Sequence, residues 1–149
     1  MAISAKLFAK GPLNMGGGSA AADGPMDLLS DSMKLSLHTS TYVPNQTTNE
    51  IFADATNELA TAGGYTNLGT ALASKVWATS ALVATFGAAN VTWTATSVTH
   101  RIATLRDDTI ATLVKPLLMY IDLGADSTTA SQDLVYAWSS GNLFTITVS

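Results

Sequence analysis

Apolar and polar residues alternate along much of the chain after Ser32. In residues 33–38 every second position is apolar, and the same period recurs in residues 91–96 and 101–106. A period of two is typical of a β-strand that buries one face and leaves the other in water. The pattern therefore predicts strands at these places, while for 101–106 it leaves open which face is buried.

Further strands follow from short apolar or alternating runs that turn residues separate. They are expected at residues 70–78, 81–86, 117–123, 134–138 and 144–148. Turns are expected where Gly, Asp, Asn and Ser gather, at Gly87, 107–108, 124–126 and 140–142. Many short strands without interleaved helices indicate a sandwich, jelly roll or barrel and argue against a parallel sheet. We predict an all-β fold, an antiparallel β-sandwich or jelly-roll-like domain with at most one short helix.

That helix is expected at residues 49–59. Ile51, Ala55 and Leu59 recur four residues apart, as on one face of an amphipathic helix, and the glycine pair 63–64 would end it.

The first 31 residues differ from the rest, because they are rich in glycine and alanine and show little periodicity. We expect residues 1–31 to form an extended N-terminal arm with one short strand near residues 6–10. Such an arm is either floppy or becomes ordered on a neighbouring subunit, and both alternatives stay open. Residues 32–149 then form a single β-sandwich domain.

Composition fits a protein that associates with other proteins. The 149 residues suffice for one domain, 12% are charged, about half the usual share, and threonine is about one residue in seven. Few charges leave little repulsion between copies. The absence of cysteine excludes disulfides and thiolate metal sites. The net charge of −4, without a cluster of Lys or Arg, argues against a nucleic-acid partner.

A membrane partner is not expected either. Residues 1–10 lack the uninterrupted apolar core of a signal peptide, and the apolar-leaning stretch 81–91 is broken by Thr85, Gly87 and Asn90. We expect a protein that is soluble when made.

The acidic residues give no clear site. Asp107 and Asp108 are adjacent and would point to opposite faces of a strand, so a polar turn is favoured over a cation site. Asp122, Asp126 and Asp133 could reach one cation, but they do not follow the spacing of a calcium-binding loop. A hairpin turn at Gly124 is the simpler interpretation.

The other candidate groups also lack catalytic spacing. His38 and His100 lie in no metal-binding pattern and are expected at the surface or at an interface. No serine lies in G-x-S-x-G, and the glycines 16–18 are not followed by G-K-[ST], so they form no phosphate loop. We expect no catalytic, cofactor-binding or metal-binding residue, and a non-enzymatic protein.

The three tryptophans could form a sugar-stacking platform. Trp93 and Trp138 instead lie on alternating apolar faces, where packing in the core or at a subunit interface is favoured, and Trp77 is less clearly placed. Asn45 and Asn90 begin glycosylation sequons, which arise by chance in a threonine-rich chain.

Several segments carry a resemblance to known proteins. They are a K-x-x-L-x-T-x-x-Y-x-P strand at 34–44, a G-G-Y-T loop at 63–66, a V-T-W strand at 91–93, an R-x-A strand at 101–103, a P-L-L-M-Y-I-D-L-G strand at 116–124 and an F-T-I-T-V strand at 144–148. In this order they resemble a widespread group of small virion proteins of tailed bacteriophages. The resemblance spans about residues 33–149, and the segment 1–31 departs from it.

The resemblance implies a structural protein of the virion, assembled in the cytoplasm of the bacterial host. The leading hypothesis is a capsid decoration or minor capsid protein that binds the major capsid protein and itself, as a homo-oligomer with a trimer favoured. Its arm would add a strand to a sheet edge of a capsid subunit. The alternative is a tail, baseplate or fibre component that binds host carbohydrate through Trp77 and the loop tyrosines Tyr42 and Tyr65, which would then be exposed.

Overall fold

The computed structural model describes residues 3–15, 25–110 and 115–147, and these form an all-β fold of antiparallel strands. The predicted fold class is thereby confirmed. No helix in the described ranges is long and apolar enough to cross a membrane. The elements are β1 (Ser4–Leu7), α1 (Gly11–Met15), β2 (Met33–His38), the 3-10 turn η1 (Phe52–Asp54), β3 (Thr70–Ala71), β4 (Val76–Ser80), β5 (Val83–Gly87), β6 (Val91–Thr96), β7 (Thr99–Asp107), β8 (Leu117–Thr128), β9 (Gln132–Tyr136) and β10 (Asn142–Thr147).

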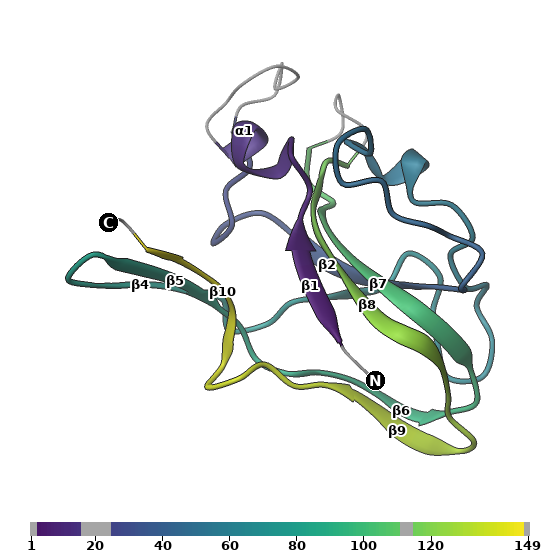
Figure 1. Cartoon of the computed structure of the whole chain (residues 1–149). Helices are drawn as coiled ribbons and strands as arrows, with labels where there is room; N and C mark the ends of the chain where they lie inside the picture. The colour runs from purple at the N-terminus through teal and green to yellow at the C-terminus, as the bar shows by residue number, and fades with distance from the viewer. Residues whose placement is uncertain (1–2, 16–24, 111–114, 148–149) are drawn as a thin grey trace.

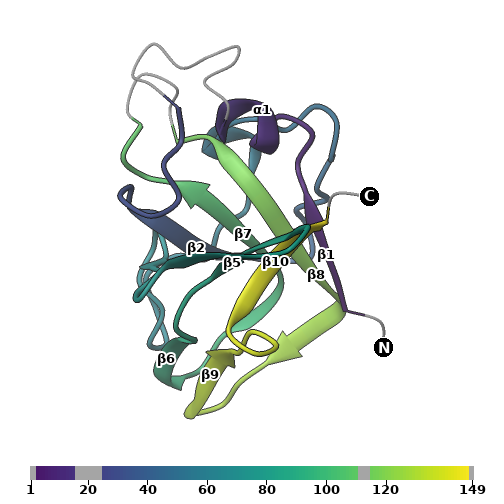
Figure 2. The ribbon, with the colours of Figure 1, turned by 90° about the vertical axis from the view of Figure 1, so that its left-hand side faces the viewer.

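The strands of the described residues form three sheets. The largest has five strands in the order β1-β8-β7-β2-β3, a ribbon pairs β6 with β9, and a three-stranded sheet has the order β10-β5-β4. Figure 1 shows the β6–β9 ribbon below the five-stranded sheet, while β4, β5 and β10 extend sideways from the body. Figure 2 turns this extension toward the viewer.

One face of the five-stranded sheet builds the main core. Leu35 of β2 lies opposite Leu105 of β7, which lies opposite Met119 of β8, and all three side chains are buried. Their cluster includes Trp93 of β6 and Phe86 of β5, which close the core from the other layer. Burial of each such large side chain contributes roughly 1.5–3 kcal/mol. The alternation predicted for residues 33–38 therefore sets the packing of the two layers.

The opposite face of the same sheet is also buried, although it carries polar groups. Arg106 of β7 is fully buried, donates to Ser36 Oγ and to the Leu68 carbonyl 2.8 Å away, and its guanidinium lies 3.7 Å from the centre of the Phe52 ring. Asp108 accepts from Arg106 at 3.3 Å. The long connection 39–68 supplies Phe52 and the Leu68 carbonyl, so it covers this face. Both faces of residues 102–106 are thus buried, which answers the question that the periodicity left open.

The helix predicted at residues 49–59 is wrong, and only the short turn η1 forms there. Ile51 makes a β-bridge with Pro116, and the Leu59 amide donates to the Leu37 carbonyl at 2.9 Å. The Asp54 carboxylate accepts from the Ile51 amide at 3.1 Å. These bonds to neighbouring strands and to a side chain occupy backbone groups that a helix would need.

The turn predicted at residues 124–126 is also wrong, because β8 continues through it to Thr128. His100 pairs with Ser127 and Ile102 pairs with Asp122, so the residues of β8 between them form a bulge opposite Arg101. Gly124 has a φ of +79°, which suits glycine in a bulge as well as in a turn. A third correction concerns 70–78, where two strands, β3 and β4, form instead of one.

The described part of the N-terminal segment lies on this domain. β1 pairs with β8, and Phe8, which follows β1, is fully buried. Met26 and Leu28 are almost completely buried. The strand expected near residues 6–10 thus forms slightly earlier, at Ser4–Leu7. The glycines 16–18 lie outside the described residues.

Two arginines of β7 give a matched test of this architecture. We expect Arg106→Met to lower the free energy of unfolding by about 3 kcal/mol, because Asp108 and the acceptors on Ser36 and Leu68 lose a buried donor. Arg101→Met should cost much less, since the ion pair of Arg101 with Asp122 is partly exposed and screened by water. Urea denaturation of both variants measures this difference. Equal losses would contradict the role given to Arg106.

Candidate interaction surface

The three-stranded sheet of β4, β5 and β10, called the projecting sheet below, extends away from the body of the protein (Figure 1). β4 and β5 form a hairpin whose turn holds Ala81, with a φ of +50°, and Leu82. β10 pairs with the other side of β5 in a regular register from Phe144 to Thr147. β5 is therefore the central strand, and β4 and β10 are the two edges.

An aromatic row fixes the base of the projecting sheet to the core. Trp77, Phe86 and Phe144 lie side by side across the three strands, and the ring centres of Phe86 and Phe144 are 5.5 Å apart. Phe86 is fully buried in the main core. Aromatic pairs at such distances add to the stability gained by burial.

Packing decreases toward the tip of the projecting sheet. The next row on the same face consists of Thr79, Ala84 and Ile146, and Ile146 is 41% exposed. Leu82 in the hairpin turn is 62% exposed. The small side chains of this row leave a shallow hollow of about 210 Å³ beside Leu82 and Ile146. The tip therefore presents apolar groups that the described part of the chain does not bury.

The projecting sheet carries no charge. Residues 76–99 and 134–149 contain no Asp, Glu, Lys or Arg, and these ranges include all three strands. Edge strands of proteins are usually protected from unwanted pairing by a lysine, a proline or a bulge. Neither β4 nor β10 has a charge or a proline, and the one irregularity in the pairing of β10 lies at its start, before Phe144. Among the described residues no strand pairs with the outer edge of β4 or of β10, so both edges are open to another strand.

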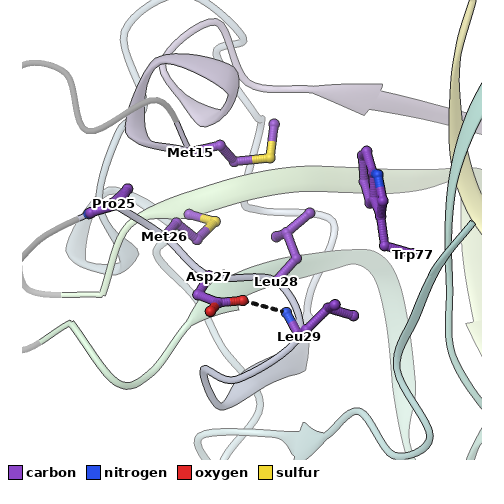
Figure 3. Close-up of a pocket in the computed structure, with 7 residues that line it drawn as sticks. All are labelled: Met15, Pro25, Met26, Asp27, Leu28, Leu29 and Trp77. Atoms are coloured by element: carbon purple, nitrogen blue, oxygen red, sulfur yellow. Dashed lines mark hydrogen bonds between the residues drawn. The ribbon is translucent and has the colours of Figure 1, made fainter. Parts of the chain in front are cut away.

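An apolar pocket of about 390 Å³ lies where the projecting sheet meets the N-terminal segment (Figure 3). Its polar side chain, Asp27, is turned to the backbone, where it accepts from the Leu29 and Ser30 amides at 2.9 and 3.1 Å. These bonds lower the pKa of the Asp27 carboxyl. The lining residues are Met15, Pro25, Met26, Asp27, Leu28, Leu29 and Trp77. The pocket therefore offers a mainly apolar wall next to β4.

The exposure expected for the two loop tyrosines is wrong. Tyr42 is 4% and Tyr65 is 1% exposed. Tyr65 accepts from the Leu37 amide at 3.1 Å and donates to Glu58 at 2.7 Å, so it covers the edge of β2 beyond β3. Burial raises the pKa of both tyrosines above the usual range. Trp77 is half-buried in the aromatic row and lines the pocket.

The other two tryptophans lie where their alternation predicts. Trp93 is buried in the main core, and Trp138 packs against the same cluster while its indole N–H donates to the Ala89 carbonyl at 3.0 Å. Their side chains are therefore part of the packing between the β6–β9 ribbon and the sheet.

Both histidines are fully buried, so their expected place at a surface or interface is wrong. His38 Nδ1 lies 2.9 Å from the Thr56 carbonyl, to which it donates, and Nε2 lies 2.8 Å from Thr104 Oγ1. Burial lowers the pKa of His38 to about 4. His100 lies 3.0 Å from the Tyr136 hydroxyl, and burial lowers its pKa as well. Both rings serve the packing between elements.

The adjacent aspartates at the end of β7 have different environments. Asp107 is fully buried and accepts from the Thr109 amide at 2.7 Å, and burial together with the nearby Asp31 raises its pKa to about 7. Asp108 forms ion pairs with Lys34 at 2.6 Å and Lys115 at 2.9 Å, in addition to Arg106. The sequence predicts a polar turn for both residues and does not reveal the buried carboxyl, because two adjacent polar residues look the same whether their side chains are buried or exposed.

The remaining acidic candidates are engaged separately. Asp122 binds Arg101 at 2.9 Å, Asp133 accepts from the Ala95 amide at 3.0 Å, and Asp126 is exposed. In the part of the chain that the structure describes, no group of three or more His, Cys, Asp or Glu is placed to hold a metal ion.

Comparisons with known proteins found no match. No protein-family model matches the chain, and neither a curated protein nor a solved structure is significantly similar to it. The resemblance to tailed-phage virion proteins therefore stays a prediction from the sequence motifs.

The buried Asp107 gives a test by pH. Its folded-state pKa of about 7 exceeds the ordinary value of 3.8, so the fold disfavours the charged carboxylate. We expect the wild type to lose stability relative to Asp107→Asn as the pH rises from about 4 to about 7, and the difference to level off above that range. Thermal or urea unfolding across this range measures it.

Asp122→Asn is the matched control, because the fold lowers the pKa of Asp122 and raises that of Asp107. Arg101 lowers the pKa of Asp122, so the wild type should lose its advantage over this variant only as the pH falls below 3.8. A difference between wild type and Asp107→Asn that stays constant from pH 4 to 7 would contradict the burial of a protonated Asp107.

Proposed function

We propose that this protein is a non-enzymatic structural component of a bacteriophage particle, most directly a capsid decoration or minor capsid protein. It acts through contacts with the major capsid protein and with copies of itself, in the virion. The resemblance of residues 33–149 supplies the setting. The projecting sheet supplies the physical argument.

The observation that carries the proposal is an uncharged sheet held away from the body with two open edges and an apolar tip. A three-stranded sheet gains stability from a covered face, and the tip of the projecting sheet has little cover. Exposed apolar groups and unpaired strand edges favour association. A partner that covers this sheet would bury its apolar groups and pair its strand edges. A capsid surface or a neighbouring copy could be such a partner.

The use of the reactive groups also supports a structural role. His38 and His100 are buried with hydrogen-bond partners inside the fold, and Asp107 is enclosed at the end of β7. All three side chains are fully buried, so none of them faces the solvent from which a substrate would come.

The alternative, a tail or fibre component that binds carbohydrate, has less support from the residues named for it. Tyr42 and Tyr65 are buried, and Trp77 lines a mainly apolar pocket, whereas a sugar needs hydrogen-bonding groups beside the aromatic ring. We therefore place the capsid role first and treat a tail location as one outcome of the electron cryo-microscopy experiment below.

A pair of charge substitutions tests the role of the projecting sheet. We expect Leu82→Glu to lower the occupancy of this protein on phage particles about tenfold, because the tip leucine would lose at least ~1.5 kcal/mol of burial. Val43→Glu is the control, since Val43 is 79% exposed in the connection 39–68, outside the projecting sheet. Occupancy is measured on purified particles by gel densitometry, after both variants are shown to unfold at the wild-type temperature. Equal occupancy of the two variants would contradict a role of this sheet.

Electron cryo-microscopy of the intact particle tests the location. Density for this fold on the outer surface of the head supports the capsid role, and density confined to the tail supports the alternative. If purified particles contain none of this protein, both the capsid role and the tail alternative are overturned.

A further inference from the structure

We infer that two copies of this chain pair through the outer edge of β10, antiparallel and around a two-fold axis at Thr145. The two three-stranded sheets would then form one continuous sheet of six strands. This inference rests on the proposed function and deepens it, because it names one partner of the projecting sheet and the strand that partner binds.

The outer edge of β10 is open and regular. β10 ends the order β10-β5-β4, and no other strand of the described residues pairs with it. From Phe144 to Thr147 its pairing with β5 continues without a break. Its free amide and carbonyl groups therefore form a straight row that another strand can bind.

The sequence of β10 is complementary to itself. In an antiparallel pair around Thr145, Phe144 of each copy lies opposite Ile146 of the other, and Thr145 lies opposite its own copy. An aromatic residue opposite a β-branched one, and threonine opposite threonine, are favourable cross-strand pairs. Phe144 and Ile146 also share the face that carries the aromatic row, so the pairing would extend that apolar face across both copies.

The edge of β4 is a poorer choice. Pairing of β4 with its copy around Ala78 would place Trp77 opposite Thr79 and Val76 opposite Ser80, so each apolar residue would meet a hydroxyl. β4 also begins next to Lys75, whose ammonium donates to the Asp31 carbonyl and so ties that end to the N-terminal segment. β10 is free of both disadvantages.

The absence of charge on the projecting sheet allows a second copy to be the partner. Two chains of net charge −4 repel each other, and the projecting sheet is a surface on which they can meet without bringing like charges together. A contact of β10 with itself uses the same patch on both copies and so has two-fold symmetry. The trimer favoured under the leading hypothesis would need a further contact elsewhere on the chain.

A single cysteine tests this contact directly, because the chain contains none of its own. Residues that face each other in an antiparallel pair have Cα atoms about 4.5–5.5 Å apart, within the range of a disulfide. We expect Thr145→Cys to form a covalent dimer upon mild oxidation at low protein concentration. Thr85→Cys, at the paired position in the central strand β5, and Ala78→Cys, on the edge of β4, should stay monomeric on a non-reducing gel. A dimer from Ala78→Cys without one from Thr145→Cys would overturn the choice of β10.

Opposite charges at the same position provide the second measurement. Thr145→Lys and Thr145→Glu should each weaken self-association by at least about tenfold, since each places like charges face to face, and an equimolar mixture of the two should associate again. Sedimentation equilibrium measures both, and melting temperatures check that the variants are folded. Wild-type protein that stays monomeric at every concentration would overturn the inference.

The two proposals fail differently. If the wild type is monomeric while Leu82→Glu still loses its place on the particle, the β10 contact is wrong and the virion role stands. If the protein dimerises through Thr145 but is absent from purified particles, the contact stands and the virion role is wrong.

Discussion

The structure depends on β7 being buried on both faces while it pairs with β2 on one side and β8 on the other. Because side chains of a strand alternate, such a strand must send every second residue into each of two environments. Ala103 and Leu105 enter the main core, whereas Thr104 and Arg106 face the connection 39–68. A buried guanidinium requires acceptors, so this connection has to bring the Leu68 carbonyl and the Phe52 ring to Arg106. The irregular segment is thus as strictly determined as the strands.

Burial also distinguishes the body of the protein, which is packed around β7, from the projecting sheet, which is packed only at its base. Phe86 belongs to the main core and also to the aromatic row at the base of the projecting sheet, so the two share one packed junction. Beyond that junction the rows contain threonine and alanine, and the apolar side chains at the tip are partly exposed. Stability within a protein follows local burial, and it should therefore decrease along this sheet from its base to its tip. A partner that covers the tip would remove this gradient.

Much of the fold follows from the sequence, and the differences have identifiable causes. The strands at 33–38 and 91–96 were predictable because apolar and polar residues alternate strictly there, whereas the adjacent Ile102 and Ala103 left the buried face of 101–106 open. The spacing of Ile51, Ala55 and Leu59 is compatible with a helix as well as with the irregular segment that forms. Backbone hydrogen bonds to β2 and β8, which are distant in sequence, stabilise the irregular segment instead. Gly124 shows the same ambiguity, since its positive φ serves a bulge as readily as a turn.

The candidate surface was less predictable than the fold. The uncharged run 76–99 is visible in the sequence, yet alternating threonines and apolar residues indicate a strand in the body as much as one that extends from it. The burial of Tyr42 and Tyr65 depends on partners such as Asn49, Glu58 and the edge of β2, which only the folded chain brings to them. The open edges of β4 and β10 are a property of the sheet order, which no local pattern encodes.

The unprotected edges also bear on how free copies of the chain would behave before the proposed assembly. A copy that has not found its place displays unpaired backbone groups and apolar side chains, the features that chaperones and proteases recognise and that allow strands to join in the wrong order. An assembled copy would hide them. In the proposed assembly, surplus subunits would therefore be removed or would aggregate, and the supply of this chain would have to match the number of places that receive it.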